Sequence, residues 1–400
     1  MSHDEAPSRQ LANDVRLRIA YVITGLKTGG AEMMLEKLVC NLLPSLDVHV
    51  ISLTSFGEIG PRLQARGVSV EAMGMRPGLP NPLLFLRLVR RLAALQPDVV
   101  HTWMYHADLL GGLAARLAGV RALIWGLRHS NLDAEANKAS TLRVVRLCAR
   151  LSSWLPQRIA CAAQKARDTH VAIGYAADRM MVIPNGFDLR RFAPDASARA
   201  SVRSELGMAA DAPLIGMVGR FDPQKNHRGF AEAMRKLHQR RPEVHALLAG
   251  ERIDPQNTSL VHWLRDAGIA DVCHLLGRRD DVPRLMASLD VLVLPSIGEA
   301  FPNVVGEAMA CGVPCVVADV GDAADIVGDL GRVVASGDMS ALADAVAGLL
   351  ALPAPERATL SSRMQDAMRQ RFDMAMVARR YEDEYRSLAA ASPRQLQRPH

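Results

Sequence analysis

The chain has 400 residues, 49% of them hydrophobic and 22% charged, a balance typical of folded globular proteins rather than disordered chains. Aromatic residues make up only 4%, too few for base-stacking platforms, so we expect no nucleic-acid partner. The formal net charge of +6 is confined to residues 1–190, which hold 23 basic against 15 acidic side chains, whereas residues 191–400 hold 25 against 27. A basic first half suggests a face for an anionic partner.

The length and the two ends indicate a two-domain protein of the cytoplasm. Four hundred residues exceed one ordinary hydrophobic core. The N-terminus is polar and lacks the apolar core of a signal peptide, and no run of 18 apolar residues occurs. We therefore expect a cytoplasmic protein that can work at the inner face of the plasma membrane. Residues 1–16 and 391–400 are expected to be disordered. The six cysteines form no C-x2-C pair, which predicts reduced, buried thiols.

In the first half, short apolar segments alternate with helical patterns. Strands are expected at 19–23, 48–53, 97–102 and 122–127, separated by amphipathic helices such as 31–43 and 83–95. Short apolar strands that alternate with helices predict a parallel sheet covered on both faces. Residues 17–187 are expected to form this first Rossmann-like domain.

The loop after the first strand carries the adjacent glycines Gly29 and Gly30. Such a pair lets backbone N–H groups approach an anion at a helix N-terminus. The loop lacks the Gly-Lys-Ser/Thr of a Walker motif, and its glycine spacing is wrong for a dinucleotide fingerprint. The second strand also runs into Thr54 without an acid for a ribose, which disfavours a dinucleotide-dependent oxidoreductase.

Histidines gather near the ends of first-half strands without forming a metal motif. His101 and His106 are spaced as an H-x4-H pair, but they fall at a strand end and in a loop, and His129 lies in another loop. The sequence contains no D-x-D motif. We therefore expect no metal site.

The second half repeats the alternation. Strands are expected at 214–219, 244–250, 272–277, 290–295 and 315–320. The boundary falls in the Asn-Gly-containing stretch 182–195, so residues 188–372 should form a second Rossmann-like domain. A helix at 373–390 is expected to pack back across the junction. The fold class is thus α/β, with two doubly wound parallel sheets, and ligands should bind beyond the strands' carboxyl ends, in the cleft between domains.

Two loops of the second half could carry chemistry. Arg220 and Lys225 follow a strand tip and could converge on a diphosphate, since guanidinium offers a bidentate fork and ammonium a point charge. The stretch 298–315 places Glu299 in a loop and Glu307 inside the following helix. The free N–H groups at that helix N-terminus, near Asn303 and neighbouring Val304, could contact a phosphate or a polyol.

Five motifs occur in an order that resembles one family: GGAE, IPNGFD, GRFDPQKN, LLGRRDDV and the E-x7-E pattern of Glu299 and Glu307. Over residues 17–388 the chain resembles a retaining glycosyltransferase of the GT-B fold, family four, of the bacterial surface-polysaccharide kind. One departure is Ala300, where the family usually has glycine. Another is Arg128, which precedes the histidine.

The resemblance implies a role for each motif. Arg220 and Lys225 would bind the donor's diphosphate, Glu307 its ribose, and Glu299 the hydroxyls of its sugar. The other implied donor-site residues are Gly29, Gly30, Arg278, Ala300, Phe301, Asn303 and Val304. His129 matches the family's histidine near the anomeric carbon, so the implied catalytic set is His129, Arg220, Lys225 and Glu299.

The resemblance also implies a reaction. A sugar would pass from a nucleoside-diphosphate sugar, with UDP favoured over GDP, to a glycan or polyprenyl-linked acceptor, with retention and without cofactor or metal. The helical stretches 83–95 and 141–155 combine apolar faces with arginines and could rest on an anionic membrane. Two alternatives stay open, a nucleotide-sugar epimerase of the same fold and an inactive nucleotide-sugar binding module.

Overall fold

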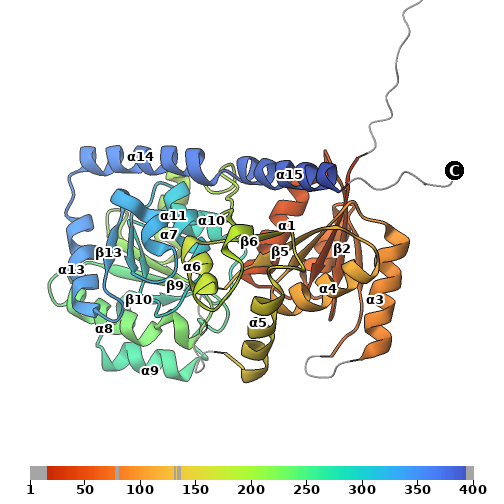
Figure 1. Cartoon of the computed structure of the whole chain (residues 1–400). Coiled ribbons are helices and arrows are strands. Elements are labelled where there is room, and N and C mark those ends of the chain that lie inside the picture. Colours follow the sequence, from red (N-terminus) through yellow and green to blue (C-terminus); the bar gives the residue numbers. More distant parts are fainter. Residues whose placement is uncertain (1–15, 77–80, 130–131, 133–136, 393–400) are drawn as a thin grey trace, which may run out of the picture.

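The computed structural model describes residues 16–76, 81–129, 132 and 137–392. The terminal segments expected to be disordered lie almost entirely outside this part of the chain. Within it, the chain forms two parallel sheets, each covered by helices on both faces, which lie side by side (Figure 1). The predicted fold class is confirmed.

The first sheet has seven strands in the order β3-β2-β1-β4-β5-β6-β7. Strand β1, Arg18–Ile23, pairs in parallel with two neighbours, so that Ile19 faces Val48 on one side and Val99 on the other. The strands are β1 Arg18–Ile23, β2 Asp47–Ser52, β3 Ser69–Ala72, β4 Val99–Trp103, β5 Ala122–Leu127, β6 Arg158–Cys161 and β7 Met180–Val182. The helices are α1 Gly30–Leu42, α2 Ile59–Ala65, α3 Pro82–Leu95, α4 Tyr105–Leu117, α5 Ala139–Leu151, α6 Gln164–Ala172 and the 3-10 turn η1 Ala177–Arg179.

The second sheet has six strands in the order β10-β9-β8-β11-β12-β13. The strands are β8 Leu214–Val218, β9 His245–Ala249, β10 Cys273–Leu275, β11 Val291–Leu294, β12 Cys315–Ala318 and β13 Arg332–Val334. The helices are α7 Ala196–Glu205, α8 His227–His238, α9 Thr258–Asp266, α10 Val282–Ser288, α11 Asn303–Ala310, α12 Ala323–Val327 and α13 Met339–Leu350. Three 3-10 turns lie between them: η2 Pro223–Lys225, η3 Ala270–Val272 and η4 Gly328–Leu330.

Successive side chains of an inner strand point to opposite faces of the sheet and therefore belong to two separate hydrophobic cores. On β1, Tyr21 packs with α1 and the last helix of the chain, whereas Val22 packs with α3, α4 and α5 on the opposite face. Both side chains are fully buried. A strand buried on both faces is uniformly apolar, which is why the sequence pattern located these strands so directly.

The two C-terminal helices run along one side of both domains (Figure 1). Helix α14, Ala354–Phe372, packs on the second domain, and α15, Met374–Ala391, packs on α1 and β4 of the first. The chain passes between domains at Phe187, whose N–H donates to Phe372 O (2.8 Å) and whose carbonyl accepts from Met374 N (3.0 Å). Two hydrogen bonds therefore join the linker at Phe187 to the segment between α14 and α15, where the chain returns to the first domain.

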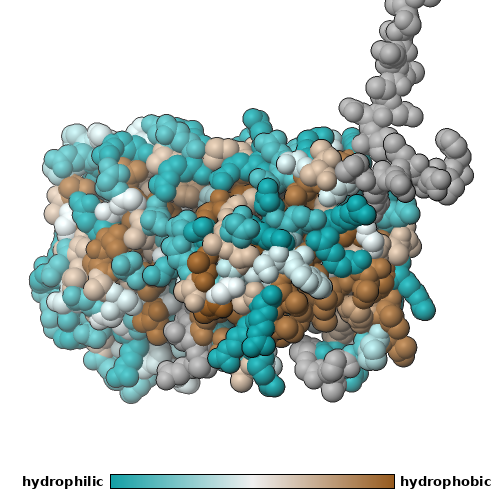
Figure 2. Space-filling view, in the orientation of Figure 1, coloured by the Kyte–Doolittle hydropathy of each residue, from teal (hydrophilic) through white to brown (hydrophobic). Residues whose placement is uncertain are grey.

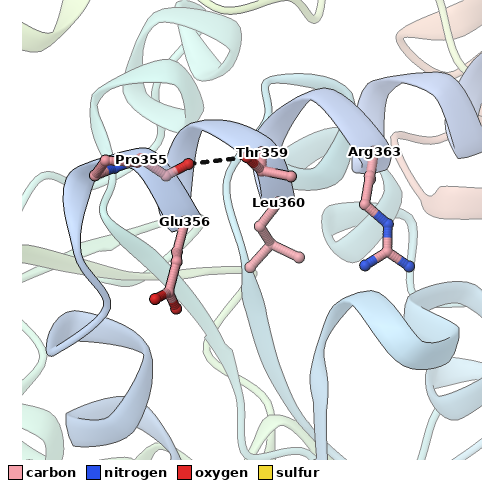
Figure 3. A pocket seen from close by; sticks show the side chains of 5 residues that line it. All are labelled: Pro355, Glu356, Thr359, Leu360 and Arg363. Atoms are coloured by element: carbon pink, nitrogen blue, oxygen red, sulfur yellow. Dashed lines mark hydrogen bonds between the residues drawn. The ribbon is translucent and has the colours of Figure 1, made fainter.

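Further features concern thiols, membranes and surface hollows. All six cysteines are unpaired, and all except the half-buried Cys40 are buried. None of the helices in the described part of the chain is long and apolar enough to cross a membrane. Figure 3 shows a shallow hollow along α14, lined by Pro355, Glu356, Thr359, Leu360 and Arg363. The hydrogen bond drawn there, from Thr359 Oγ1 to Pro355 O (3.0 Å), joins two residues of the same helix. We assign the hollow no role.

Candidate active site

Lys225 and Glu299 meet at the carboxyl ends of the second sheet. Strands β8 and β11 are neighbours, so the loops that follow them lie together. Lys225 Nζ lies 2.5 Å from Glu299 Oε1, and Ser296 Oγ donates to the same oxygen at 2.8 Å. Both side chains of the pair are largely buried, at 23% and 10% exposure. A cation and an anion placed 74 positions apart in the sequence thus form one polar centre.

The loop that carries Lys225 is held by its own neighbours. Asn226 has φ 56°, a left-handed conformation that asparagine tolerates better than most residues. Its Oδ1 accepts from Gly229 N (3.0 Å) at the start of α8, and its Nδ2 donates to Pro295 O (3.1 Å) after β11. Asn226 therefore caps one helix and fastens the Lys225 loop to the Glu299 loop.

Arg220 faces the first domain from the open side of the same loop. Its guanidinium pairs with Asp222 (Nη2–Oδ2 3.0 Å), and its side chain remains 62% exposed. The positive charge of Arg220 lowers the pKa of both Glu32 and His129, although burial still raises the pKa of Glu32 overall. Arg220, Glu32 and His129 therefore border one space between the domains.

His129 follows β5 in the first domain. Its ring stacks on that of Tyr105, with centroids 6.1 Å apart. The side chain is open to solvent, yet protein surrounds it on most sides. This crowding, together with the charge of Arg220, lowers the pKa of His129 below its ordinary value, so the imidazole is neutral at pH 7. A neutral imidazole can accept a hydrogen bond from a substrate hydroxyl.

Glu307 is paired with a lysine of the other domain. Lys37 Nζ, on α1, lies 3.5 Å from Glu307 Oε1, on α11. Burial raises the pKa of Glu307, and Lys37 partly opposes this shift. Glu299 and Glu307 therefore have separate lysine partners, Lys225 and Lys37. Lys37 was missed from the sequence, where it is one more basic residue of an amphipathic helix.

The glycine loop of the first domain faces the N-terminus of α11. A Cβ atom on Gly30 would lie 3.6 Å from Asn303 Nδ2, and the Glu32 carboxylate lies against Gly29. Asn303 and Val304 open the helix, and the buried Phe301 stacks on Phe187 of the linker, with ring centroids 6.2 Å apart. These residues, predicted from two separate motifs, line the same interdomain space.

Ala300 fits its loop without strain. It is not among the described non-glycine residues with positive φ, so the backbone at this position does not require glycine. Its carbonyl accepts from Asp322 N (2.9 Å). The Asp322 carboxylate in turn accepts from Gln164 N (2.7 Å) and Lys165 N (3.0 Å) at the start of α6. The Ala300 loop is thus fixed to the first domain.

Two family models match this chain, in the order of its two sheets. Residues 28–191 match the model described as Glycosyltransferase Family 4, and residues 212–351 match Glycosyl transferases group 1. The chain is a family-four glycosyltransferase. Among solved structures, HepE of Anabaena in complex with UDP superposes with a TM-score of 0.82, at 25% identity, over 93% of this chain and 100% of that one. WaaG, at 16% identity and a TM-score of 0.70, supports the GT-B fold.

Curated relatives cover most of this glycosyltransferase. EpsF of Bacillus subtilis (strain 168) is 28% identical over 363 residues, which are 86% of this chain and 91% of that one. The Escherichia coli UDP-Gal:alpha-D-GlcNAc-diphosphoundecaprenol alpha-1,3-galactosyltransferase is 28% identical over 318 residues, 76% of this chain and 80% of that one. The epimerase and binding-module alternatives gain no support from these matches.

One implied donor-site residue of the glycosyltransferase lies at the rim of the interdomain space. Arg278 Nη2 lies 3.4 Å from Glu58 Oε2 of the first domain, and both side chains are more than half exposed. Glu58 also accepts a hydrogen bond from Thr28, in the loop that carries the adjacent glycines. The rim contact therefore links the LLGRRDDV turn to the glycine loop through a weak, solvent-screened pair.

Proposed function

We propose that the protein transfers a sugar, with retention and without a metal ion, from a nucleoside-diphosphate sugar to a lipid-linked or oligosaccharide acceptor. The observation that carries this proposal is the 2.5 Å contact between Lys225 and Glu299. It places a cation and a carboxylate together at the strand ends of the second domain, in the loop region that also carries Arg220, whose charge acts on His129 of the first domain. In a family-four chain, these are the groups that a departing diphosphate and a sugar require.

In the proposed donor complex, Lys225 and Arg220 bind the two phosphates, and Glu299 accepts hydrogen bonds from the sugar's hydroxyls. Without donor, the ammonium of Lys225 is neutralised by Glu299, and the guanidinium of Arg220 by Asp222. Donor binding exchanges these contacts for phosphate contacts. Preorganised cations placed where negative charge develops stabilise the transition state more than the ground state.

The proposed chemical step occurs on one face of the sugar. The bond between the anomeric carbon and the diphosphate oxygen breaks, and both electrons leave with the diphosphate. The acceptor hydroxyl attacks from the same face, and its proton passes to the departing phosphate oxygen. Glu299 then positions the sugar and forms no covalent bond, so the two-carboxylate logic of glycosidases does not apply.

UDP is the proposed nucleotide, and a polyprenyl-diphosphate sugar the proposed acceptor. HepE was crystallised with UDP, and the E. coli relative is named for a UDP-galactose donor and a diphosphoundecaprenol-linked acceptor. The matches cover most of those chains, which supports the transfer of these substrate classes to this protein.

A polyprenyl-linked acceptor lies in a membrane, so the protein needs a surface that can approach one. We consider the surface formed by α3 and α5, here called the outer face of the first domain. Helices α3 and α5 both pack beside α4, and hydrophobic surface gathers along the lower side of this domain (Figure 2). Large apolar side chains are exposed there beside arginines: Leu83, Leu86, Arg87 and Arg90 on α3, and Arg143, Arg146, Leu147 and Arg150 on α5. Exposed apolar and basic groups together suit the surface of an anionic membrane, and we propose peripheral contact through this face.

A ligand panel tests the function. Purified protein in EDTA is melted with UDP, GDP, ADP or NAD. A nucleotide at about 100 times its dissociation constant adds about 2.7 kcal/mol to the protein's free energy of unfolding, so the melting temperature of the protein should rise. We expect a rise with UDP and none with NAD. Transfer of radiolabelled sugar from UDP-galactose or UDP-glucose to polyprenyl-diphosphate N-acetylglucosamine, with the anomeric configuration read by NMR, then tests the reaction. Stabilisation by NAD alone would overturn the proposal.

A further inference from the structure

Arg128 stands directly before His129 and has no part in the mechanism above. Only 7% of the residue is exposed. Its guanidinium lies 3.6 Å from the centroid of the Trp103 ring. Nη2 donates to Tyr381 OH (2.8 Å), on α15, and Nη1 donates to Asn185 Oδ1 (3.1 Å), in the interdomain linker. Arg128 is therefore a buried cation among neutral partners that come from distant parts of the chain.

The chemistry of arginine fixes the orientation of the asparagine beside it. A guanidinium only donates hydrogen bonds, so Asn185 must turn its amide oxygen toward Arg128. Its Nδ2 then points the other way and donates to Asn303 Oδ1 at 2.9 Å. Since Asn185 offers Asn303 only a donor, Asn303 must likewise turn its oxygen toward Asn185. The two amide orientations thus follow from one cation rather than from an arbitrary placement of nitrogen and oxygen.

The series of hydrogen bonds Arg128–Asn185–Asn303, here called the relay, ends at the space between the domains. With its oxygen engaged by Asn185, Asn303 presents Nδ2 to the opposite side, where a Cβ atom on Gly30 would lie 3.6 Å away. Asn303 is also the first residue of α11, and the first N–H groups of a helix have no carbonyl partner one turn back in the helix. The side-chain amide therefore adds N–H donors to a helix N-terminus that faces the glycine loop.

We propose that Arg128 is a positioning residue that, through Asn185, holds the Asn303 amide with its N–H donors toward the donor diphosphate. This inference rests on the proposed function, because it assumes that a diphosphate lies between Gly30 and α11. Arg128 follows β5 of the first domain and Asn303 opens α11 of the second. The relay therefore forms only when the two domains hold this relative position before the donor binds. A reversed Asn303 would present its oxygen to the phosphates and repel them.

The sharpest test is Asn185→Asp. Aspartate keeps the volume and forms an ion pair with Arg128, but it cannot donate to Asn303. Asn303 must then reverse, so that its Nδ2 donates to the introduced carboxylate and its oxygen faces the glycine loop. We expect a melting temperature no lower than that of the wild type, at least tenfold weaker binding of UDP by titration calorimetry, and unchanged binding of uridine, which lacks phosphates.

Two further sets of variants keep the inference testable should Asn185→Asp fail to fold. Asn303→Asp replaces the N–H donors by a carboxylate oxygen and should lose UDP affinity to at least the same extent. Arg128→Lys retains a pure donor beside Asn185, so it should retain more UDP affinity than Arg128→Met, in which Asn185 is free to reverse. A purely structural role of Arg128 would weaken uridine and UDP binding alike.

The failure of this inference differs from failure of the proposed function. If the wild type binds neither UDP nor GDP, the function fails and the relay with it. If the wild type binds UDP and folded Asn185→Asp binds it equally well, the relay alone is overturned. Equal UDP affinity of wild type and Asn303→Asp would overturn it in the same way.

Discussion

Lys37 and Glu307 join the two domains at the point proposed for the donor ribose, with Nζ and Oε1 3.5 Å apart. Helix α1 supplies the lysine and α11 the glutamate. The buried carboxylate thus has a charged partner before any nucleotide arrives. A ribose that binds Glu307 would offer two hydroxyl donors to the oxygens that now face Lys37, so nucleotide binding and this interdomain contact are coupled.

Substitution Glu307→Gln should reduce the preference for ribose. Wild-type protein should bind UDP more tightly than 2′-deoxy-UDP, because the carboxylate accepts a charge-assisted hydrogen bond from the 2′-hydroxyl, worth about 1.5–3 kcal/mol. In Glu307→Gln the ratio of the two dissociation constants should fall by about tenfold. Titration calorimetry measures both constants. The same ratio in both proteins would mean that Glu307 does not contact this hydroxyl.

Substitution Lys225→Ala should reduce transfer to a small residual rate while the protein stays folded. Loss of one preorganised donor to developing charge costs about 3–4 kcal/mol, or about 10²–10³ in kcat. Sugar transfer is measured at saturating donor, and the melting curve reports the fold. Lys236→Ala is a matched control, because Lys236 on α8 pairs with Glu232 one helical turn away, on the helix surface. A folded Lys225→Ala protein with wild-type kcat would contradict the diphosphate assignment.

Substitution Asp108→Asn should change the pH dependence of stability. Asp108 is fully buried, accepts from Thr102 Oγ1 (2.5 Å) and from Gly126 N (3.3 Å), and burial raises its pKa to about 7. Between about pH 4 and 7 the unfolded chain has lost this proton and the native chain retains it. Native stability therefore falls as pH rises through this window, by about 1.4 kcal/mol per unit, and is constant with respect to this group above it.

Urea unfolding of wild type and Asp108→Asn at pH 5, 6 and 7 checks this prediction. The asparagine retains the acceptor for Thr102 and Gly126 but carries no proton to lose. The stability of the variant relative to wild type should therefore rise across the three pH values. Exposed Asp344→Asn serves as the control, and its difference from wild type should show no such rise. A constant difference for Asp108→Asn would contradict the raised pKa.

The outer face of the first domain should bind anionic vesicles. Wild-type protein should sediment with vesicles that contain phosphatidylglycerol and remain in solution with pure phosphatidylcholine, since each basic side chain near an anionic surface contributes about 1 kcal/mol. Leu83→Glu, which places a charge at an apolar side chain with 74% exposure, should weaken sedimentation several-fold. Leu117→Glu, on α4 at 67% exposure, shows whether α4 belongs to the same face. Undiminished sedimentation of Leu83→Glu would argue against contact through α3.

The central strands were predictable because burial on both faces makes them apolar throughout. The segment expected at 19–23 is β1, Arg18–Ile23, and that expected at 122–127 is β5. The short strands β3, β6, β7 and β13 were missed. Each has three or four residues, and Ser69 and Arg332 are exposed, so their pattern does not differ from that of a loop. Their place in the sheet comes from pairing with a longer neighbour.

The candidate site was predictable only where a motif marked it. Lys225 and Glu299 lie in recognisable loops after strands, and the structure brings them together. Lys37 and Asn185 lack such a signal, because their partners Glu307 and Arg128 are remote in sequence and are brought near by the packing of two domains. Arg128 was conspicuous beside His129, but its contacts depend on Tyr381, 253 positions later.

The path of the last helix has a consequence for how the chain is made. Tyr385 of α15 closes a hydrogen bond with Tyr21 of β1 (2.7 Å) and another with His101 of β4 (2.7 Å), across 364 and 284 positions. The first domain emerges from the ribosome long before this helix is synthesised, so the face of the first sheet that α1 and α15 share stays only partly covered while the second domain emerges and folds. The N-terminal domain is therefore completed only when the C-terminal helix α15 packs on it. A chain truncated before α15 would lose stability in its N-terminal domain.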